Sequence, residues 1–271
     1  MTTHFTTRDG VRLAYVDEGR GLPVLWQHGL GADRSQPAEV FPCIEGIRRI
    51  TLECRGHGAS ALGNTDRLTI EQFAHDALAL LDHLNIEQAV VGGISLGAAI
   101  ALRLAALYPG RARALILARP AWLDEPGPEH LRVYRDVALL LAEFGADEGQ
   151  QRLNELDRMQ ALEAISADNA ASMRSFFTRA NPASTIALLT RIPTQGPGVA
   201  RADIGQLAIP ALVIGHGEDY VHALDTARTL ADWIPHAQLR VITSKTVDRT
   251  RYVHEFQQAV DAFLESLRNR S

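Results

Sequence analysis

The sequence predicts an α/β fold, a mostly parallel, doubly wound sheet of about eight strands with an inserted helical cap. Short, nearly continuous apolar runs, such as VLW (24–26), AVVGGI (89–94) and LILA (115–118), are typical of strands buried on both faces of a parallel sheet. Segments with helical periodicity separate these runs over most of the chain. One long stretch, 121–200, interrupts the alternation with helical patterns and no good strand.

Each element has its own local signal. Residues 4–10 and 11–19 predict an opening antiparallel hairpin around Asp9-Gly10. Apolar stripes at helical spacing predict helices over 69–84 and 96–107, the second ending before Tyr108-Pro109-Gly110. The remaining strands are expected at 23–29, 47–54, 88–95, 113–119, 210–217 and 237–243. This order divides the chain into a core, 1–120 and 201–271, and a cap or lid, 121–200.

Composition limits the classes of function. The 271 residues are 46% hydrophobic and 22% charged, as in a globular protein with a full core, and the net charge is −5. No basic patch predicts nucleic-acid binding, and no apolar run of about 18 residues predicts a membrane span. The N-terminus lacks a signal-peptide pattern, so a cytoplasmic protein is expected, with a small-molecule substrate as partner and either a monomer or a homodimer as assembly. Cys43 and Cys54 match no metal-binding spacing and are expected as free thiols. Nothing in the sequence indicates a metal or an organic cofactor, and neither is expected.

The segment Gly93-Ile94-Ser95-Leu96-Gly97 lies where a predicted strand meets a predicted helix. Such a turn forces its middle residue into a strained conformation and lifts that side chain above the sheet. The residues two before and two after must be nearly without side chains, and both are glycine. Ser95 is therefore the candidate nucleophile, at a helix N-terminus that favours negative charge.

A second glycine-rich segment, Gln27-His28-Gly29-Leu30-Gly31, begins within the last residues of the predicted strand 23–29 and continues into the loop that follows it. Acyl transfer needs two backbone N–H groups directed at the developing oxyanion. The N–H groups of Leu30 and Leu96 are the candidates for this oxyanion hole. His28 is interpreted as either a histidine that fixes the loop or a contact to the substrate.

With these motifs the chain resembles the α/β-hydrolase-fold superfamily, in its serine-nucleophile branch with a helical cap. The matching pieces are HGLG (28–31), ECRGHGAS (53–60), GISLG (93–97) and PALVIGHGED (210–219). The resemblance implies Ser95 as nucleophile and Asp219 as the acid that orients the base, with Glu218 and Asp124 as weaker candidates for the acid. It also implies the order nucleophile, acid, histidine along the chain.

The histidine of that order is missing from its usual place. In the family it follows the next strand, and at 24 to 26 residues past Asp219 this sequence has Thr243, Ser244 and Lys245. Of the ten histidines, His222 and His216 flank the acid, so His222 and Lys245 are the two candidates for the general base, with no base as a third alternative. A free lysine titrates near ~10.4 and would have to lose about three units to serve at neutral pH.

A carboxylate beside Lys245 would favour its charged form instead. Lys245 is therefore interpreted either as the ion-pair partner of Asp219, as a contact to an anionic or carbonyl-bearing ligand, or as a solvated side chain. Arg119 and Trp122, which leave strand 113–119 at the edge where ligands bind in such sheets, are candidate substrate-binding residues.

The sequence thus predicts a serine-nucleophile hydrolase of the carboxylic ester type, acting on a small ester, lactone, thioester or C–C substrate through an acyl-enzyme. Two alternatives stay open. One is a non-hydrolytic, ligand-binding protein with a degraded triad and Lys245 in the histidine slot, and the other is an acyltransferase or lyase that uses Ser95 and Lys245.

Overall fold

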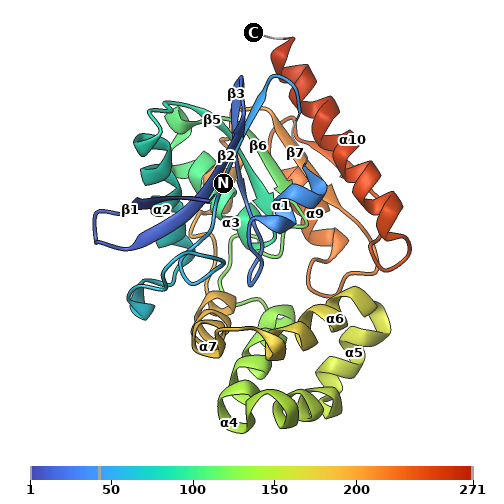
Figure 1. Cartoon of the computed structure of the whole chain (residues 1–271). Helices are drawn as coiled ribbons and strands as arrows, with labels where there is room; N and C mark the ends of the chain where they lie inside the picture. The colour runs from blue at the N-terminus through green and yellow to red at the C-terminus, as the bar shows by residue number, and fades with distance from the viewer. Residues whose placement is uncertain (1, 42–43, 270–271) are drawn as a thin grey trace.

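A computed structural model describes residues 2–41 and 44–269. In this part of the chain, eight strands form one sheet in the order β1-β2-β4-β3-β5-β6-β7-β8 (Figure 1). The first two strands join the sheet antiparallel and all later pairs are parallel. The strands are β1 (Thr3–Thr6), β2 (Arg12–Gly19), β3 (Leu22–Gln27), β4 (Ile47–Leu52), β5 (Ala89–Ile94), β6 (Ala112–Ala118), β7 (Ala211–Gly215) and β8 (Gln238–Val241). The α/β prediction is confirmed.

The register of the central strands decides where functional side chains meet. Gln27 pairs with Gly93, Ile94 with Ala118, and Ala118 with Ile214. The carboxyl ends of β3, β5, β6 and β7 therefore lie at one edge of the sheet. Loops that leave these four strands come together there, as is usual for ligand sites in open α/β sheets.

Helices cover both faces of the sheet. One hydrophobic cluster joins the sheet to α2 (Ile70–His83), α3 (Leu96–Leu107) and α9 (Leu224–Trp233), with the short α8 (Arg201–Ile204) beside them. The other face packs against α1 (Ser35–Val40) and α10 (Arg249–Arg268), which Figure 1 shows along the side of the molecule. Helix α10 faces inward with a buried row that includes Tyr252, Phe256, Val260 and Phe263.

The segment between β6 and β7 folds as a helical layer separate from the sheet (Figure 1). Its main helices are α4 (Arg132–Glu155), which is interrupted at Gly145, α5 (Asp157–Ile165), α6 (Ala167–Ser175) and α7 (Pro182–Arg191). Two hydrogen bonds tie the start of α6 to the core: the Ser166 Oγ–Thr246 Oγ1 contact at 3.1 Å, and Val221 N donating to Asn169 Oδ1 at 3.0 Å.

Two features bear on the expectations from composition. No helix among the described residues is long and apolar enough to cross a membrane. Cys54 is a free, buried thiol whose pKa is raised by burial, whereas Cys43 lies outside the described residues.

Candidate active site

Ser95 adopts the strained backbone that its motif predicts, with φ 56° and ψ −110° between β5 and α3. Positive φ is uncommon for a residue with a side chain and costs about 1–3 kcal/mol. The backbone is too crowded for a side chain at either flanking glycine. A Cβ on Gly93 would lie 2.6 Å from the Gly97 carbonyl carbon, and one on Gly97 would lie 2.3 Å from Gln27 O. The close approach of three backbones therefore requires glycine at both positions.

The loop after β3 is held by side chains that leave one N–H free. Gly29 N donates to Gln36 Oε1 at 2.7 Å, and Gly31 N donates to His57 Nε2 at 3.0 Å. The intervening N–H of Leu30, like that of Leu96 at the start of α3, donates to no acceptor in the described part of the chain. These two N–H groups are thus without an acceptor among the described residues, and free N–H groups are what an oxyanion hole needs.

His28 does not reach the substrate side, which corrects its candidate role as a binding residue. Its side chain is fully buried; Nδ1 contacts Gly29 O at 2.8 Å and Nε2 accepts from Cys54 N at 3.0 Å. His57 is occupied in the same way, by Arg55 O and the N–H of Gly31. Burial lowers the pKa of both imidazoles, so they act as neutral braces of the two loops.

Asp219 lies at the centre of a buried charge cluster after β7. Its carboxylate contacts His222 Nδ1 at 3.0 and 3.1 Å and accepts from His222 N at 3.0 Å. Arg119, which follows β6, donates to Asp219 Oδ2 from Nε at 2.9 Å and from Nη2 at 2.6 Å. His216 Nε2 lies 3.5 Å from the same oxygen. The acid therefore has an imidazole on one side and a guanidinium on the other.

The electrostatics fix the charge states in this cluster. Burial alone would raise the pKa of Asp219, but Arg119 and then His222 lower it to well below its usual range. Burial lowers the pKa of His222, with Asp219 opposing and Arg119 adding to the decrease. Burial and Arg119 together lower the pKa of His216 to about 4. At neutral pH the acid is ionised and both histidines are neutral.

The tautomer of His222 follows from its partner. A carboxylate only accepts hydrogen bonds, so the proton lies on Nδ1 and the lone pair on Nε2. That Nε2 is buried and has no hydrogen-bond partner among the described residues. It belongs to a side chain that lines, together with Ser95, a cavity of about 110 Å³. The side chains of Ser95 and His222 thus line the same small cavity.

Arg119 and Lys245 both line this cavity, but their ion pairs differ from those considered from the sequence. Asp219 pairs with Arg119 and not with Lys245. Lys245 Nζ lies 3.7 Å from Asp168 Oδ1 of the cap, and Arg119 Nη2 lies 3.7 Å from Asp168 Oδ2. Of the three interpretations of Lys245, the ion pair with Asp219 does not fit the structure, because the guanidinium from the neighbouring strand end already occupies the carboxylate.

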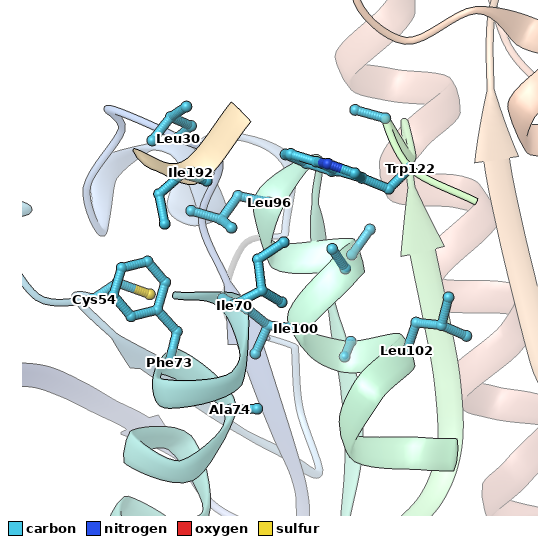
Figure 2. Packing of buried hydrophobic residues seen from close by; sticks show 14 of the residues in the cluster. Leu30, Cys54, Ile70, Phe73, Ala74, Leu96, Ile100, Leu102, Trp122 and Ile192 are labelled. Carbon is cyan, nitrogen blue, oxygen red and sulfur yellow. The ribbon is translucent and has the colours of Figure 1, made fainter. Parts of the chain in front are cut away.

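Trp122 is a packing residue and does not line the cavity of Ser95, which corrects its candidate role as a pocket wall. Figure 2 shows it within the hydrophobic cluster around α3 that also contains Leu96 and Ile192. Its indole Nε1 donates to Gln195 O at 2.8 Å, which ties the segment entering the cap to the segment leaving it. Trp122 therefore packs where the cap joins the core.

The cap contributes lining residues that sequence reasoning did not find: Tyr134, Asp168, Asn169, Ser172 and Met173. The available signal was weak, because Ser166-Ala-Asp-Asn is an ordinary helix start, with Ser166 Oγ accepting from Asn169 N.

A second cavity of about 240 Å³ lies between the loop after β3 and α7, and Ser95 does not line it. In the described part of the chain, no group of three or more His, Cys, Asp or Glu side chains could hold a metal ion.

Comparison with known proteins identifies the family of the chain. The family model described as alpha/beta hydrolase fold matches residues 23–244. The chain is a member of the alpha/beta hydrolase fold family. It is 32% identical over 249 residues to a 2-hydroxymuconate semialdehyde hydrolase of Pseudomonas sp. (strain CF600), covering 86% of this chain and 82% of that protein.

Two further proteins cover most of this family member. A 3-oxoadipate enol-lactonase 2 of Acinetobacter baylyi is 28% identical, covering 80% of this chain and 78% of that protein. The crystal structure of the enol-lactonase from Burkholderia xenovorans LB400 superposes with a TM-score of 0.77 at 22% identity, covering 97% and 100% of the two chains. The two curated relatives described here are a hydrolase and a lactonase by name, and the chain is a hydrolase.

Proposed function

We propose that this family member is a serine hydrolase of small carbonyl compounds, with Ser95 as nucleophile, His222 as general base and Asp219 as the acid that orients it. One observation carries the proposal. The Nδ1 of His222 contacts Asp219, its Nε2 is buried and has no hydrogen-bond partner among the described residues, and its side chain lines the cavity that Ser95 also lines. This arrangement keeps the chemistry of a triad although the histidine lies on the loop of the acid and not after β8.

The reaction follows from these groups. Nε2 of His222 takes the proton of Ser95 Oγ as the oxygen attacks the substrate carbonyl, and the oxyanion receives the N–H groups of Leu30 and Leu96. The protonated imidazole then gives its proton to the leaving group, whose bond to the carbonyl carbon breaks. Water, deprotonated by the same nitrogen, hydrolyses the acyl-enzyme and returns Ser95 to its hydroxyl form.

Lys245 is the weaker candidate for the base. Its ammonium lies 3.7 Å from the Asp168 carboxylate, and an ammonium has no lone pair with which to accept a proton. His222 has the opposite electrostatics, because burial lowers its pKa and keeps it neutral. We therefore assign the proton transfer to the imidazole.

The substrate class we propose is a small ester, lactone, thioester or cleavable C–C compound. Support comes from the relatives, one named for a semialdehyde substrate and the other for an enol-lactone, and from the small volume of the cavity. The cap side chains at the site restrict it further to compact, polar acyl groups.

Labelling with a fluorophosphonate probe tests the nucleophile and the base. Wild type should be labelled at Ser95 and Ser95→Ala should not. His222→Ala should label at least about a hundredfold more slowly, since general-base catalysis contributes roughly 10²–10⁴. His254→Ala is the matched control, because His254 is exposed on α10 and should change nothing. Equal labelling rates for wild type and His222→Ala would remove His222 as the base.

A second variant separates the two candidate positions for the base. Lys245→His places an imidazole in the position that usually holds the family histidine. Because Arg119 and His222 already occupy Asp219, we expect no gain in esterase rate. A large gain, persisting in Lys245→His/His222→Ala, would assign the base to the loop after β8.

A further inference from the structure

Lys245 is the single lysine of the sequence, which contains 27 basic residues in all. Arginine therefore forms the surface ion pairs, including those of Arg48, Arg152 and Arg251. The one lysine lines the cavity of Ser95. A lysine differs from an arginine there, because it is a compact point charge with three rotatable donors and not a planar fork.

The ammonium of Lys245 is the one cation of this cavity without a hydrogen-bonded partner among the described residues. Its contact to Asp168 Oδ1 measures 3.7 Å, which is too long for a hydrogen bond, and the Tyr252 ring centroid lies 5.7 Å away. Arg119, by contrast, makes two short hydrogen bonds to Asp219. The side chain of Lys245 is 20% exposed, so its donors are accessible from the cavity.

Asp168, the carboxylate next to Lys245, makes only long contacts to the cations around it. Its carboxylate lies 3.7 Å from both Lys245 Nζ and Arg119 Nη2, and no shorter hydrogen bond to it is found in the described part of the chain. The side chain is 31% exposed and lies in the first turn of α6 in the cap. Its charge balances Lys245 without saturating it, and a second carboxylate could take its place at the ammonium while Asp168 turns toward solvent.

We propose that Lys245 anchors a carboxylate of the substrate, so that the enzyme selects small acyl compounds that carry a carboxylate in addition to the bond they lose at Ser95. Asp168 stands in for that carboxylate when the site is empty and competes with it when substrate binds. The proposal rests on the proposed hydrolase function for its reaction, but the binding of a carboxylate does not require turnover.

The competing explanation is that Lys245 and Asp168 only fasten the cap to the core. A fastening contact affects every substrate equally and affects stability. An anchoring contact affects charged ligands selectively and responds in opposite directions to the two variants, because Lys245 attracts the ligand while Asp168 repels it.

Binding is tested with succinate on the Ser95→Ala protein by calorimetry at constant ionic strength, with succinamide as the neutral counterpart. Succinate should bind about ten- to a hundredfold more weakly when Lys245→Met is added, as expected for loss of a hydrogen bond to a charged group. Lys245→Arg should recover part of the affinity, and Asp168→Asn should tighten succinate severalfold. Succinamide should not follow this pattern. Equal succinate affinity with and without Lys245, or no binding to Ser95→Ala, would overturn the proposal.

Turnover then connects the anchor with catalysis. The p-nitrophenyl monoester of succinic acid is compared with p-nitrophenyl butanoate, a neutral ester of similar size. Lys245→Met should lower kcat/KM for the charged ester about ten- to a hundredfold more than for the neutral one, mainly through KM. An equal loss on both esters, with lowered Tm in Lys245→Met and Asp168→Asn alike, would mean that the contact is a fastening. If wild type hydrolyses neither ester while succinate still binds through Lys245, the hydrolase proposal fails and the carboxylate site stands.

Discussion

The buried pair of Arg119 and Asp219 offers the sharpest test of how the site is held together. Arg119→Met keeps a long side chain but removes the guanidinium. The Asp219 side chain is 1% exposed and that of Arg119 is 7% exposed, so water cannot replace the lost partner. The variant leaves an ionised carboxylate with two histidines as its neighbours.

The magnitude follows from the geometry. At the 2.6 Å between Arg119 Nη2 and Asp219 Oδ2, the attraction is about 6 kcal/mol for an effective dielectric constant of roughly 20. The desolvation of two ions offsets part of this attraction, and breaking a buried pair from one side typically costs about 3–5 kcal/mol. We expect Arg119→Met to lower the free energy of unfolding by about that amount.

Denaturant unfolding of the two single variants and the double variant measures the pair directly. Asp219→Asn in the Arg119→Met background removes the uncompensated charge, so the double variant should be more stable than the sum of the two single losses predicts. A coupling of at least about 2 kcal/mol is expected for groups in direct contact. Additive losses, or a cost of Arg119→Met below about 1 kcal/mol, would refute the assignment of Asp219 as a buried carboxylate held by Arg119.

Three further predictions concern the proton, the turn and the second histidine. The proposed mechanism needs neutral His222, and burial lowers the pKa of this imidazole from its ordinary value of 6.5. The rate kcat/KM should therefore reach half of its plateau below pH 6.5, and Arg119→Met should move this midpoint to higher pH. A half-maximal rate at pH 6.5 or above in wild type would contradict the electrostatics. Gly97→Ala should lower the free energy of unfolding by at least about 1–3 kcal/mol, since its Cβ would lie 2.3 Å from Gln27 O. Gly110→Ala is the matched control, because a Cβ at that position meets nothing within 4 Å. Similar unfolding midpoints for the two variants would argue against the tight turn. The pKa of His216 is about 4 when folded and about 6.5 when unfolded, so only the unfolded state takes up this proton between those values and stability falls as pH decreases. From pH 6.5 to 5 wild type should lose about 1.6 kcal/mol that His216→Gln does not, and parallel curves for the two proteins would exclude the shift.

Local patterns predicted the elements of the core well. The apolar runs that indicated strands lie in β3 to β8, and the glycines around Ser95 mark the turn that requires them. These features are readable because each depends on residues within a few positions of one another, whose periodicity and side-chain size follow directly from the backbone geometry. The position of Asp219 after β7 was accessible in another way, through the resemblance of PALVIGHGED (210–219) to the corresponding strand of the family.

The partners of the charged side chains could not be predicted in the same way. Counting residues past Asp219 placed Lys245 beside it, but Arg119, 100 positions earlier in the chain, occupies that carboxylate because β6 and β7 are adjacent in the sheet. His222 could be named as a candidate from the sequence, yet only the bend of its loop brings Nδ1 onto the acid.

The sequence by itself therefore determined the α/β core, the strained backbone of Ser95 and the glycine-rich loop after β3, all of which follow from short-range backbone requirements. The tertiary structure alone decided which imidazole faces the cavity, which cation holds the acid, and that the single lysine meets Asp168 of the cap. The physical reason is that ion pairing depends on distance in space, and here that distance is set by the order of strands in the sheet and by the position of a helical layer inserted between two of them.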